Sequence, residues 1–228
     1  NCNVLAEVRS MKLTGNYDDY FDMGEAKIKN LARNYDTILL RSNPGGLKRI
    51  ETSYMLDPIA DSVLITNDPR GIREMHGKTF LSNFPDYIVP YAIVKKESHF
   101  ADFLNKHNDV IVKPLDGYGG KGVKRIKDHK GPVSELFTEL EQSYKGERFI
   151  VQEFIPDAVK GDKRIIMFDG QPVCALLRVP KDADSLANVT QGATVEKAEL
   201  TLREKALCEE IGPILQDYGL FFVGLSML

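Results

Sequence analysis

The sequence predicts an α/β (α+β) protein in which short apolar strands alternate with amphipathic helices. Near the beginning of the chain, ranges 37–41 and 62–66 read as buried strands on either side of a helical pattern over 47–60. Later, the stretch 164–179 alternates around Asp169-Gly170, a dipeptide typical of two-residue hairpin turns. The first pattern favours a small α/β unit, and the second favours an antiparallel sheet further along the chain.

Periodicity and punctuation predict the remaining elements. Asp68-Pro69 opens a helix that runs to Phe84, with proline in its tolerated first turn and Lys78 on the polar face. A capping box at 201–204 begins another helix, for which Gly219 is the predicted end. Further strands are predicted over 87–94, 109–115, 123–126, 148–155 and from Leu220, and further helices over 98–107 and 132–144.

The organisation along the chain predicts two domains. Residues 1–67 have the pattern of the latter part of a small α/β domain, and residues 68–228 form a second domain. The polar stretch 180–196 is long enough to be a mobile lid. Because the chain starts with Asn1 and stops at Leu228 inside an apolar run, we expect both ends to be incomplete.

Composition excludes several classes of function. The 228 residues include no apolar run near the roughly 20 residues of a membrane span, so we expect no membrane partner. A net charge of -3, with Lys and Arg spread along the chain, predicts no face that grips nucleic acid. The cysteines, Cys2, Cys174 and Cys208, are far apart and odd in number, which fits reduced thiols in the cytoplasm.

The segment from Val112 to Val123 carries the clearest chemical signal. It contains Gly117, Gly119, Gly120 and Gly122 directly after the predicted strand that bears Lys113. Glycines let backbone N–H groups turn toward a phosphate without obstruction by a Cβ atom, and the lysine adds positive charge. Because a strand follows and no Gly-Lys-Ser/Thr ending is present, the segment is neither a Walker loop nor a dinucleotide fingerprint. It predicts a nucleotide-phosphate clamp at a hairpin tip.

Several segments together resemble the bacterial glutathione synthetases, which are ATP-grasp ligases. In order along the chain these are Lys78, 113–120, 152–156, 161–164, 177–180 and 222–225. The resemblance covers nearly the whole chain. It implies an ATP-grasp fold, with a partial N-terminal pre-ATP-grasp domain at 1–67 and an ATP-grasp domain, incomplete at its C-terminus, at 68–228.

The resemblance also implies roles for individual residues. Lys78 and Lys113 would approach the ATP phosphates from opposite sides, and the glycine loop would close over them. Arginines are suited to an acyl phosphate or a carboxylate because their planar forks bind oxygen pairs. The implied nucleotide residues are Lys78, Lys113, Gly117, Tyr118, Gly119, Gly120, Gln152, Glu153, Phe154, Ile155 and Asp162, and the implied catalytic and substrate residues are Arg164 and Arg178, with Asn188 also binding substrate.

Within the adenine segment, the resemblance implies that backbone groups of Phe154 and Ile155 read the adenine edge and that Glu153 accepts from the exocyclic amine. The implied reaction uses ATP and Mg²⁺ to join γ-glutamylcysteine to glycine, or a similar substrate pair, through an acyl phosphate. Such chemistry depends on positioning and charge neutralisation rather than on a protein nucleophile. By analogy with the family we expect a homo-oligomer.

The sequence departs from the family at the predicted metal position. Ser226 stands where the family has a magnesium-binding Asp, and a hydroxyl is a weaker ligand for a hard dication. In the predicted lid, Leu186, Gln191 and Ala193 stand where the family carries arginines. Other hypotheses therefore stay open: a ligase for a different amino-acid or peptide substrate, a grasp-fold ligase of the D-alanine:D-alanine or ribosomal-protein-modifying kind, and a paralogue that binds nucleotide without turnover.

Overall fold

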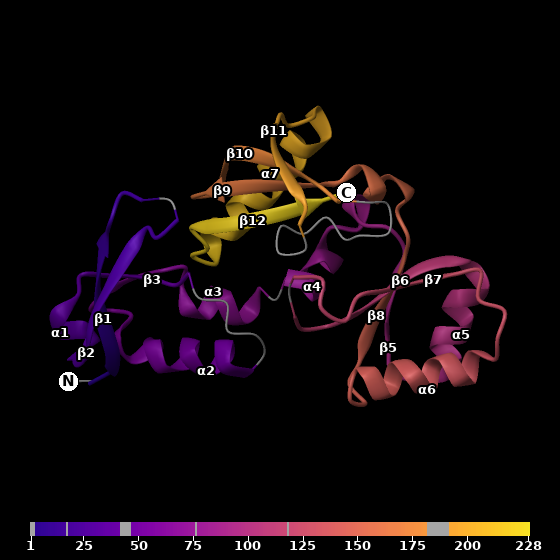
Figure 1. Ribbon diagram of the computed structural model, residues 1–228, viewed down its shortest axis with the longest axis horizontal. Helices are drawn as coiled ribbons and strands as arrows, with labels where there is room; N and C mark the ends of the chain where they lie inside the picture. Colours follow the sequence, from indigo (N-terminus) through magenta and orange to yellow (C-terminus); the bar gives the residue numbers. More distant parts are fainter. Residues whose placement is uncertain (1–2, 17, 42–46, 76, 118, 182–191) are drawn as a thin grey trace. The chain divides into compact units, whose positions relative to one another are not determined.

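The computed structural model describes residues 1–228 except 1–2, 17, 42–46, 76, 118 and 182–191 (Figure 1). The chain divides into two compact units. The first contains Asn1–Glu74 with Tyr218–Leu220, and the second contains Met75–Asp217 with Phe221–Leu228. No helix within the described ranges is both long and apolar enough to cross a membrane.

In the first unit, β3 (Thr37–Leu39) and β4 (Leu64–Thr66) form a parallel pair, as the α/β pattern predicts. Between them come α2 (Leu47–Leu56) and the short 3-10 helix η1 (Asp57–Ile59). Buried Leu56, Ile59 and Val63 make the core of this unit. The predicted strands are confirmed, although both are shorter than the apolar runs that indicated them.

A two-stranded antiparallel ribbon in the same unit has no counterpart among the predictions. It pairs β1 (Leu5–Leu13) with β2 (Phe21–Asn30) and is followed by the one-turn helix α1 (Leu31–Asn34). One face of the ribbon exposes large apolar side chains, whereas Glu7 and Arg9 interrupt that face in the middle. The interruption and a register shift between Arg9 and Met11 hide the strand periodicity in the sequence.

The single helix expected from Asp68 to Phe84 is wrong. The structure has α3 (Pro69–Glu74), then α4 (Gly77–Phe80) and η2 (Leu81–Asn83), and the boundary between the two units falls after Glu74. Gly71 lets α3 approach the backbone of Tyr218 so closely that a Cβ atom would stand 2.0 Å from the Tyr218 carbonyl oxygen. Packing of α3 against a segment far along the chain therefore overrides the continuous helical pattern.

The second unit contains a four-stranded antiparallel sheet in the order β5-β8-β6-β7. Two helices, α5 (Glu97–Lys106) and α6 (Val133–Ser143), cover one of its faces (Figure 1). The strands are β5 (Tyr91–Val94), β6 (Asp109–Pro114), β7 (Lys124–Lys127) and β8 (Phe149–Glu153). The strand predicted over 87–94 is confirmed in its second half and wrong in its first half. Pro85–Tyr87 forms the 3-10 helix η3 instead. The strand begins after Pro90, which has no N–H to donate to a neighbouring strand.

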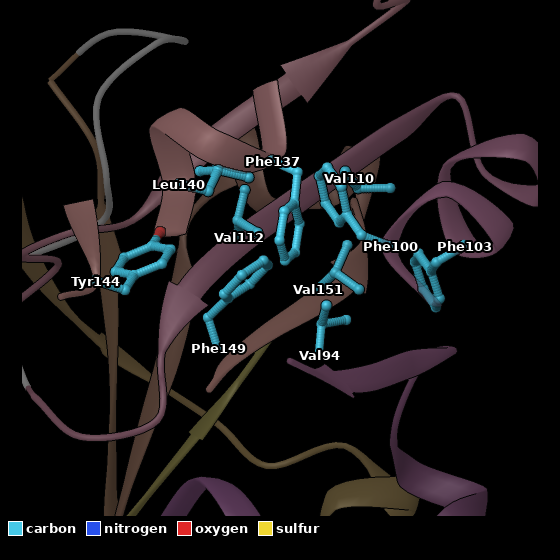
Figure 2. Close-up of a cluster of buried hydrophobic side chains, with 10 residues drawn as sticks. All are labelled: Val94, Phe100, Phe103, Val110, Val112, Phe137, Leu140, Tyr144, Phe149 and Val151. Carbon is cyan, nitrogen blue, oxygen red and sulfur yellow. The ribbon is translucent and has the colours of Figure 1, made fainter. Parts of the chain in front are cut away.

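The core of this sheet lies between the strands and the helices (Figure 2). It consists of Val94, Phe100, Phe103, Val110, Val112, Phe137, Leu140, Tyr144, Phe149 and Val151. Because side chains alternate along a strand, Val110 and Val112 on the helix-covered face place Asp109, Ile111 and Lys113 on the opposite face.

A second antiparallel sheet has the order β11-β10-β9-β12. The predicted hairpin is confirmed, since β9 (Asp162–Phe168) and β10 (Gln171–Val179) turn at Asp169 and Gly170 with φ angles of 45° and 71°. The other strands are β11 (Thr194–Ala198) and β12 (Phe222–Met227). The loop predicted over 180–196 is therefore too long at its C-terminal end, whereas 182–191 lies outside the described residues.

Helix α7 (Leu202–Asp217) begins and ends as the sequence predicts. The Thr201 N–H donates to Glu204 Oε2 over 2.7 Å, and the Glu204 N–H donates to Thr201 Oγ1 over 3.2 Å, which completes the capping box. Gly219 follows the helix with a φ angle of 62°. The helix approaches the hairpin turn closely, because a Cβ atom on Gly212 would stand 2.4 Å from the Gly170 carbonyl oxygen.

Candidate active site

Two lysines meet at the C-terminal end of β6. Lys113 lies on the sheet face that the helices leave uncovered, and its Nζ donates to Gln152 Oε1 on the neighbouring strand β8 over 2.5 Å. Lys78, from the short helix α4, donates to the Pro114 carbonyl oxygen over 2.5 Å. The structure thus brings together two residues that are far apart in the sequence and that the phosphate-binding hypothesis paired.

Among the residues that the structure describes, neither lysine forms a close ion pair, and both have perturbed pKa values. Burial, together with repulsion from Lys78, lowers the pKa of Lys113 to about 8. Burial also lowers the pKa of Lys78, an effect that the charge of Asp116 partly offsets. Two partly buried cations close together are electrostatically unfavourable. A bound polyanion would stabilise the charged form of both lysines.

The glycine loop after β6 has the backbone conformation that a phosphate clamp needs. Gly117, Gly119, Gly120 and Gly122 all have φ angles in the left-handed region, at 119°, 69°, 73° and 73°. The Gly117 N–H donates to Asp116 Oδ1 over 3.0 Å. Runs of such residues turn N–H groups into a concave anion site, and side chains would oppose this conformation. Tyr118, also predicted to bind nucleotide, lies outside the described residues.

Tyr144 anchors the end of this loop. Its hydroxyl, at the C-terminal end of α6, donates to the Gly122 carbonyl oxygen over 2.7 Å. Burial raises the pKa of Tyr144 to about 12, so the hydroxyl remains a donor across the physiological range. A core aromatic residue therefore fixes one end of the loop, a role that the sequence analysis did not predict.

The predicted adenine segment lies at the end of β8, and its groups point in different directions. The Gln152 side chain lies beside Lys113, whereas the Glu153 carboxylate lies 3.6 Å from His107 Nδ1. Alternation along β8 therefore puts Glu153 on the helix-covered face, away from Gln152. That side chain is poorly placed to accept from an adenine amine on the open face.

Backbone groups of this segment are partly committed to the sheet. The Glu153 N–H donates to the Pro90 carbonyl over 2.9 Å, and the Phe154 N–H donates to the Asp109 carbonyl over 2.9 Å. The Phe154 N–H is thus occupied by the sheet, and of its backbone groups the carbonyl is the one left for the adenine edge. The Ile155 N–H has no acceptor among the residues that the structure describes, which leaves it available for an adenine ring nitrogen.

Asp109 and Arg125 adjoin this segment and were missed by the sequence analysis. Arg125 Nε lies 2.8 Å from Asp109 Oδ1, and Arg125 Nη2 lies 2.6 Å from Asp109 Oδ2. The Arg125 Cζ atom lies 3.5 Å from the centroid of the Phe154 ring. The sequence predicts the two strands of this hairpin but not their register. In the observed register Asp109 pairs with Lys127 and Ile111 with Arg125, so Arg125 lies diagonally opposite Asp109 on the same sheet face.

On the second sheet, Arg164 and Arg178 project from adjacent strands toward Ser226. Arg178 Nε donates to Asp162 Oδ1 over 2.7 Å, and its Nη2 donates to Asp162 Oδ2, so the pair is bidentate. Ser226 Oγ accepts from Arg164 Nη1 and from Arg178 Nη2, both over 3.0 Å. Asp162, predicted to bind nucleotide, is engaged by Arg178 instead of standing open.

Ser226 does not fit a divalent cation in this arrangement. Its neutral hydroxyl accepts from two guanidinium groups, and a dication would have to displace or approach two positive charges. Within the described part of the chain, no group of three His, Cys, Asp or Glu side chains could hold a metal ion. The excess positive charge here suits an anion, such as a carboxylate or phosphate.

Most of the predicted lid residues lie in the range 182–191. Asn188, Leu186 and Gln191 lie outside the described residues. Ala193 is described and is buried directly before β11. Every described candidate residue, from Lys78 to Ser226, belongs to the second of the two units.

Two antiparallel sheets in one unit, the first with a lysine-flanked glycine hairpin, are the architecture of the ATP-grasp proteins, which are ATP-dependent ligases. Comparisons agree with this class. Residues 77–228 match the family described as prokaryotic glutathione synthetase, ATP-grasp domain, and residues 1–73 match its N-terminal domain. The chain belongs to the prokaryotic glutathione synthetase family.

Individual relatives give the same result. The chain is 36% identical over 226 residues to the glutathione synthetase of Brucella melitensis, covering 99% of this chain and 72% of that protein. Among solved structures, the D-cycloserine synthetase DcsG is similar with a TM-score of 0.65 and 16% identity, over 87% of this chain and 72% of that one. The D-alanine–D-alanine ligase of Bacillus anthracis, solved with ATP, is similar with a TM-score of 0.58 and 14% identity. The match covers 86% of this chain and 63% of that one. These distant structures support the fold alone.

Proposed function

We propose that this protein synthesises glutathione from γ-glutamylcysteine and glycine with ATP. The observation that carries the proposal is the pair Lys78 and Lys113 beside the glycine loop, in a chain of this family. Burial lowers the pKa of both lysines, and Lys78 also repels Lys113, so a polyanion such as the triphosphate of ATP would relieve the electrostatic cost of both. The family of the chain favours the substrate pair.

Different residues of the proposed site bind different parts of the nucleotide. Lys78, Lys113 and the backbone of Gly117, Gly119 and Gly120, with Tyr118, bind the phosphates. The Ile155 N–H and the carbonyl groups of 153–155 read the adenine edge, and Gln152 orients Lys113. Asp162 contributes indirectly by holding the Arg178 guanidinium flat.

In the proposed reaction, a substrate carboxylate oxygen attacks the γ-phosphorus of ATP, and the bond to the bridging oxygen breaks to release ADP. The amine nitrogen of the second substrate then attacks the acyl carbon, phosphate leaves, and the nitrogen loses a proton to solvent. Arg164, Arg178 and Asn188 hold the carboxylate and the acyl phosphate. Fixed positive groups stabilise the charge that develops on oxygen, and no protein nucleophile is needed.

A divalent metal accompanies ATP in ATP-grasp ligases, and we propose Mg²⁺ as this ion. When bound, it would neutralise part of the triphosphate charge, with phosphate oxygens as its ligands. Ser226 is not suited to hold it. No step of the proposed reaction depends on a metal–protein bond from the described residues.

We also propose that copies of the chain associate in the cytoplasm through the apolar face of the β1–β2 ribbon. An isolated two-stranded ribbon is marginally stable in water, and one face of this ribbon exposes large apolar side chains on both sides of a central charged pair. Glu7 and Arg9 are the charged residues on that face and have opposite signs, so a two-fold related copy would present Arg9 to Glu7. The exposed apolar residues are Leu5, Met11, Leu13, Phe21, Met23 and Ile28.

Ser226 favours one alternative, a paralogue that binds nucleotide without turnover. The deciding experiment incubates the purified protein with ATP, Mg²⁺, γ-glutamylcysteine and glycine and measures phosphate release and glutathione by mass spectrometry. We expect both products with wild type and neither with Lys78→Met. ATP binding without phosphate release on any substrate of an amino-acid and dipeptide panel would reject the ligase proposal in favour of the paralogue.

A further inference from the structure

We propose that Asp109 and Arg125 are positioning residues that clamp the adenine-reading end of β8 and so set the affinity for the nucleotide base. The proposal rests on the proposed ATP-dependent function. Its basis is a closed cycle of contacts among three residues on three adjacent strands or strand ends, on the sheet face that also carries Lys113.

The cycle begins and ends at Asp109, the first residue of β6. The carboxylate of Asp109 takes both arms of the Arg125 fork, at 2.8 and 2.6 Å. Arg125, on β7, lies over the Phe154 ring with its Cζ atom 3.5 Å from the ring centroid. The Phe154 N–H closes the cycle by donating to the Asp109 carbonyl over 2.9 Å. Phe154 is thus held through both its backbone and its side chain.

This double attachment fixes the group that the proposed site needs next. Phe154 follows the last residue of β8, and Ile155 comes directly after it with φ and ψ of −92° and 111°. The Ile155 N–H, which is available for a ligand, therefore takes its direction from a residue locked on two sides. Releasing Phe154 would let this N–H rotate while the rest of β8 remained paired with β5 and β6.

The contacts are polar but not freely solvated. The side chains of Arg125 and Asp109 expose 33% and 28% of their surface, less than typical surface ion pairs. Hydrogen bonds from Arg125 hold the pKa of Asp109 below its usual range, so the pair is ionised at neutral pH. A bidentate arginine–carboxylate pair also fixes orientation, which a single-point lysine contact does not.

The clamp lies apart from both the hydrophobic core and the phosphate-binding groups. The core side chains Val110 and Val112 point to the other sheet face, so shortening Arg125 leaves no cavity among them. Asp109 and Pro114 are the two ends of β6, separated by about 17 Å in an extended strand. Lys113 and the glycine loop are at the far end. A defect in the clamp should therefore affect the base of ATP and spare its phosphates.

The test compares ATP with inorganic tripolyphosphate, which has the phosphates without the base, by calorimetry in the presence of Mg²⁺. For Arg125→Met and for Asp109→Asn we expect the Kd for ATP to rise about tenfold and that for tripolyphosphate to change less than about twofold. The double variant should be no worse than either single one, because each breaks the same cycle. Arg125→Lys should recover only part of the affinity.

Lys124→Met is the matched control. Lys124 precedes Arg125 on β7 and pairs with Glu139 on α6 over 2.8 Å, on the opposite side of the strand. We expect it to bind both ligands like wild type. In turnover, the clamp variants should raise KM for ATP and leave kcat unchanged, since neither residue touches the reacting atoms.

The possible failures are distinguishable. Equal losses of ATP and tripolyphosphate affinity would overturn the clamp, because they would mean that Arg125 acts on the phosphates or on the fold. Unchanged ATP affinity in Arg125→Met would also overturn it. If Arg125→Met does not fold by circular dichroism, Asp109→Asn and Phe154→Leu give the same comparison. Wild type that binds neither ligand would instead reject the proposed function.

Discussion

The guanidinium group of Arg164 lies directly over Gly224 on the adjacent strand β12, where a Cβ atom would stand 2.3 Å from Arg164 Nη2. The same guanidinium donates to Ser226 Oγ, two residues further along that strand. A missing side chain on β12 therefore makes room for the arginine to lie flat and reach the hydroxyl. Gly224 acts on the second sheet as a spacer for a proposed catalytic residue.

Gly224→Ala should impair catalysis more than folding. The clash involves the end of a flexible side chain, so Arg164 will move off Ser226 rather than disturb the strand. Because the moved group would no longer stabilise the acyl phosphate, we expect kcat to fall about tenfold or more, with a melting temperature within about 2 °C of wild type. Steady-state phosphate release and thermal denaturation measure the two effects. Gly131→Ala, in an exposed turn facing only the His129 ring, is the control, and equal loss of activity in both variants would contradict the idea.

Gly161→Ala should have the opposite profile and act mainly on stability. Gly161, just before β9, has a φ angle of 118°, and a Cβ atom there would stand 2.6 Å from the Arg178 carbonyl oxygen. A backbone carbonyl cannot move away from the added atom as the end of a flexible side chain can. We therefore expect a loss of about 2–3 kcal/mol in the free energy of unfolding. Gly146→Ala separates the two causes, since its φ angle is 70° but nothing lies within 4 Å of the added atom. Chemical denaturation should show roughly 1 kcal/mol for this control.

Features determined by local chemistry were predictable from the sequence. Asp169-Gly170 takes positive φ angles at both residues, and Thr201 with Glu204 forms the capping box, because each depends only on residues close in the chain. Lys113 could be singled out because a lysine in an apolar strand before a glycine run has few structural reasons to be there.

Features determined by packing between distant segments were not predictable. The break after Glu74 arises where the close approach of Gly71 to Tyr218 fixes α3, and Tyr218 lies far along the chain. The side of β8 on which Glu153 lies depends on which strand face the helices cover. Likewise, the bond from Phe154 to Asp109 required the β6–β8 pairing, which connects segments that are not consecutive.

Lys113→Met should stabilise the protein while abolishing nucleotide binding. A folded-state pKa of about 8, against 10.5 for an unperturbed lysine, means that the charged side chain disfavours the folded state at neutral pH by on the order of 3 kcal/mol. Allowing for the lost hydrogen bond to Gln152, we expect a gain of about 2 kcal/mol in unfolding free energy at pH 7. Urea denaturation and ATP calorimetry measure the two quantities, and a destabilised variant would refute the electrostatic account.

The same pKa sets the sign of a pH effect on stability. Between pH 8 and 10.5 the unfolded chain binds more protons at this lysine than the folded protein, so this contribution to stability rises with pH. The advantage of Lys113→Met over wild type should therefore be full below pH 8 and shrink as pH increases to 10. Lys113→Arg keeps its charge throughout this range. The difference in stability between Lys113→Met and Lys113→Arg should therefore stay constant as the pH rises.

Mutations on the apolar face of the β1–β2 ribbon should dissociate the proposed homo-oligomer. Met11→Lys and Ile28→Lys each place a charge on a side chain that exposes 62% or 66% of its surface in the single chain, so neither should harm folding. We expect the mass measured by light scattering after size exclusion to fall to that of one chain. Val173→Lys, at a similarly exposed apolar position on β10 with 57% exposure, should leave the mass unchanged. Ribbon variants that keep the wild-type mass, or a wild type that is monomeric, would exclude this surface as the interface.

ATP affinity should be level at neutral pH and fall above pH 8. Lys113 must be protonated to attract phosphate, and burial with repulsion from Lys78 lowers its pKa to about 8 in the free protein. Above that value each pH unit should weaken binding by up to about tenfold, until the bound-state pKa is reached. The triphosphate raises the pKa of Lys113, so binding near pH 8.5 should take up a proton. Calorimetry in two buffers of different ionisation enthalpy measures that uptake.

The control is Lys113→Arg, which should bind ATP without proton uptake and without the fall in affinity at pH 8. Only a weaker decline at higher pH should remain, caused by Lys78, whose pKa is also lowered. Proton release on binding, or the same inflection in Lys113→Arg, would show that another group controls the nucleotide site.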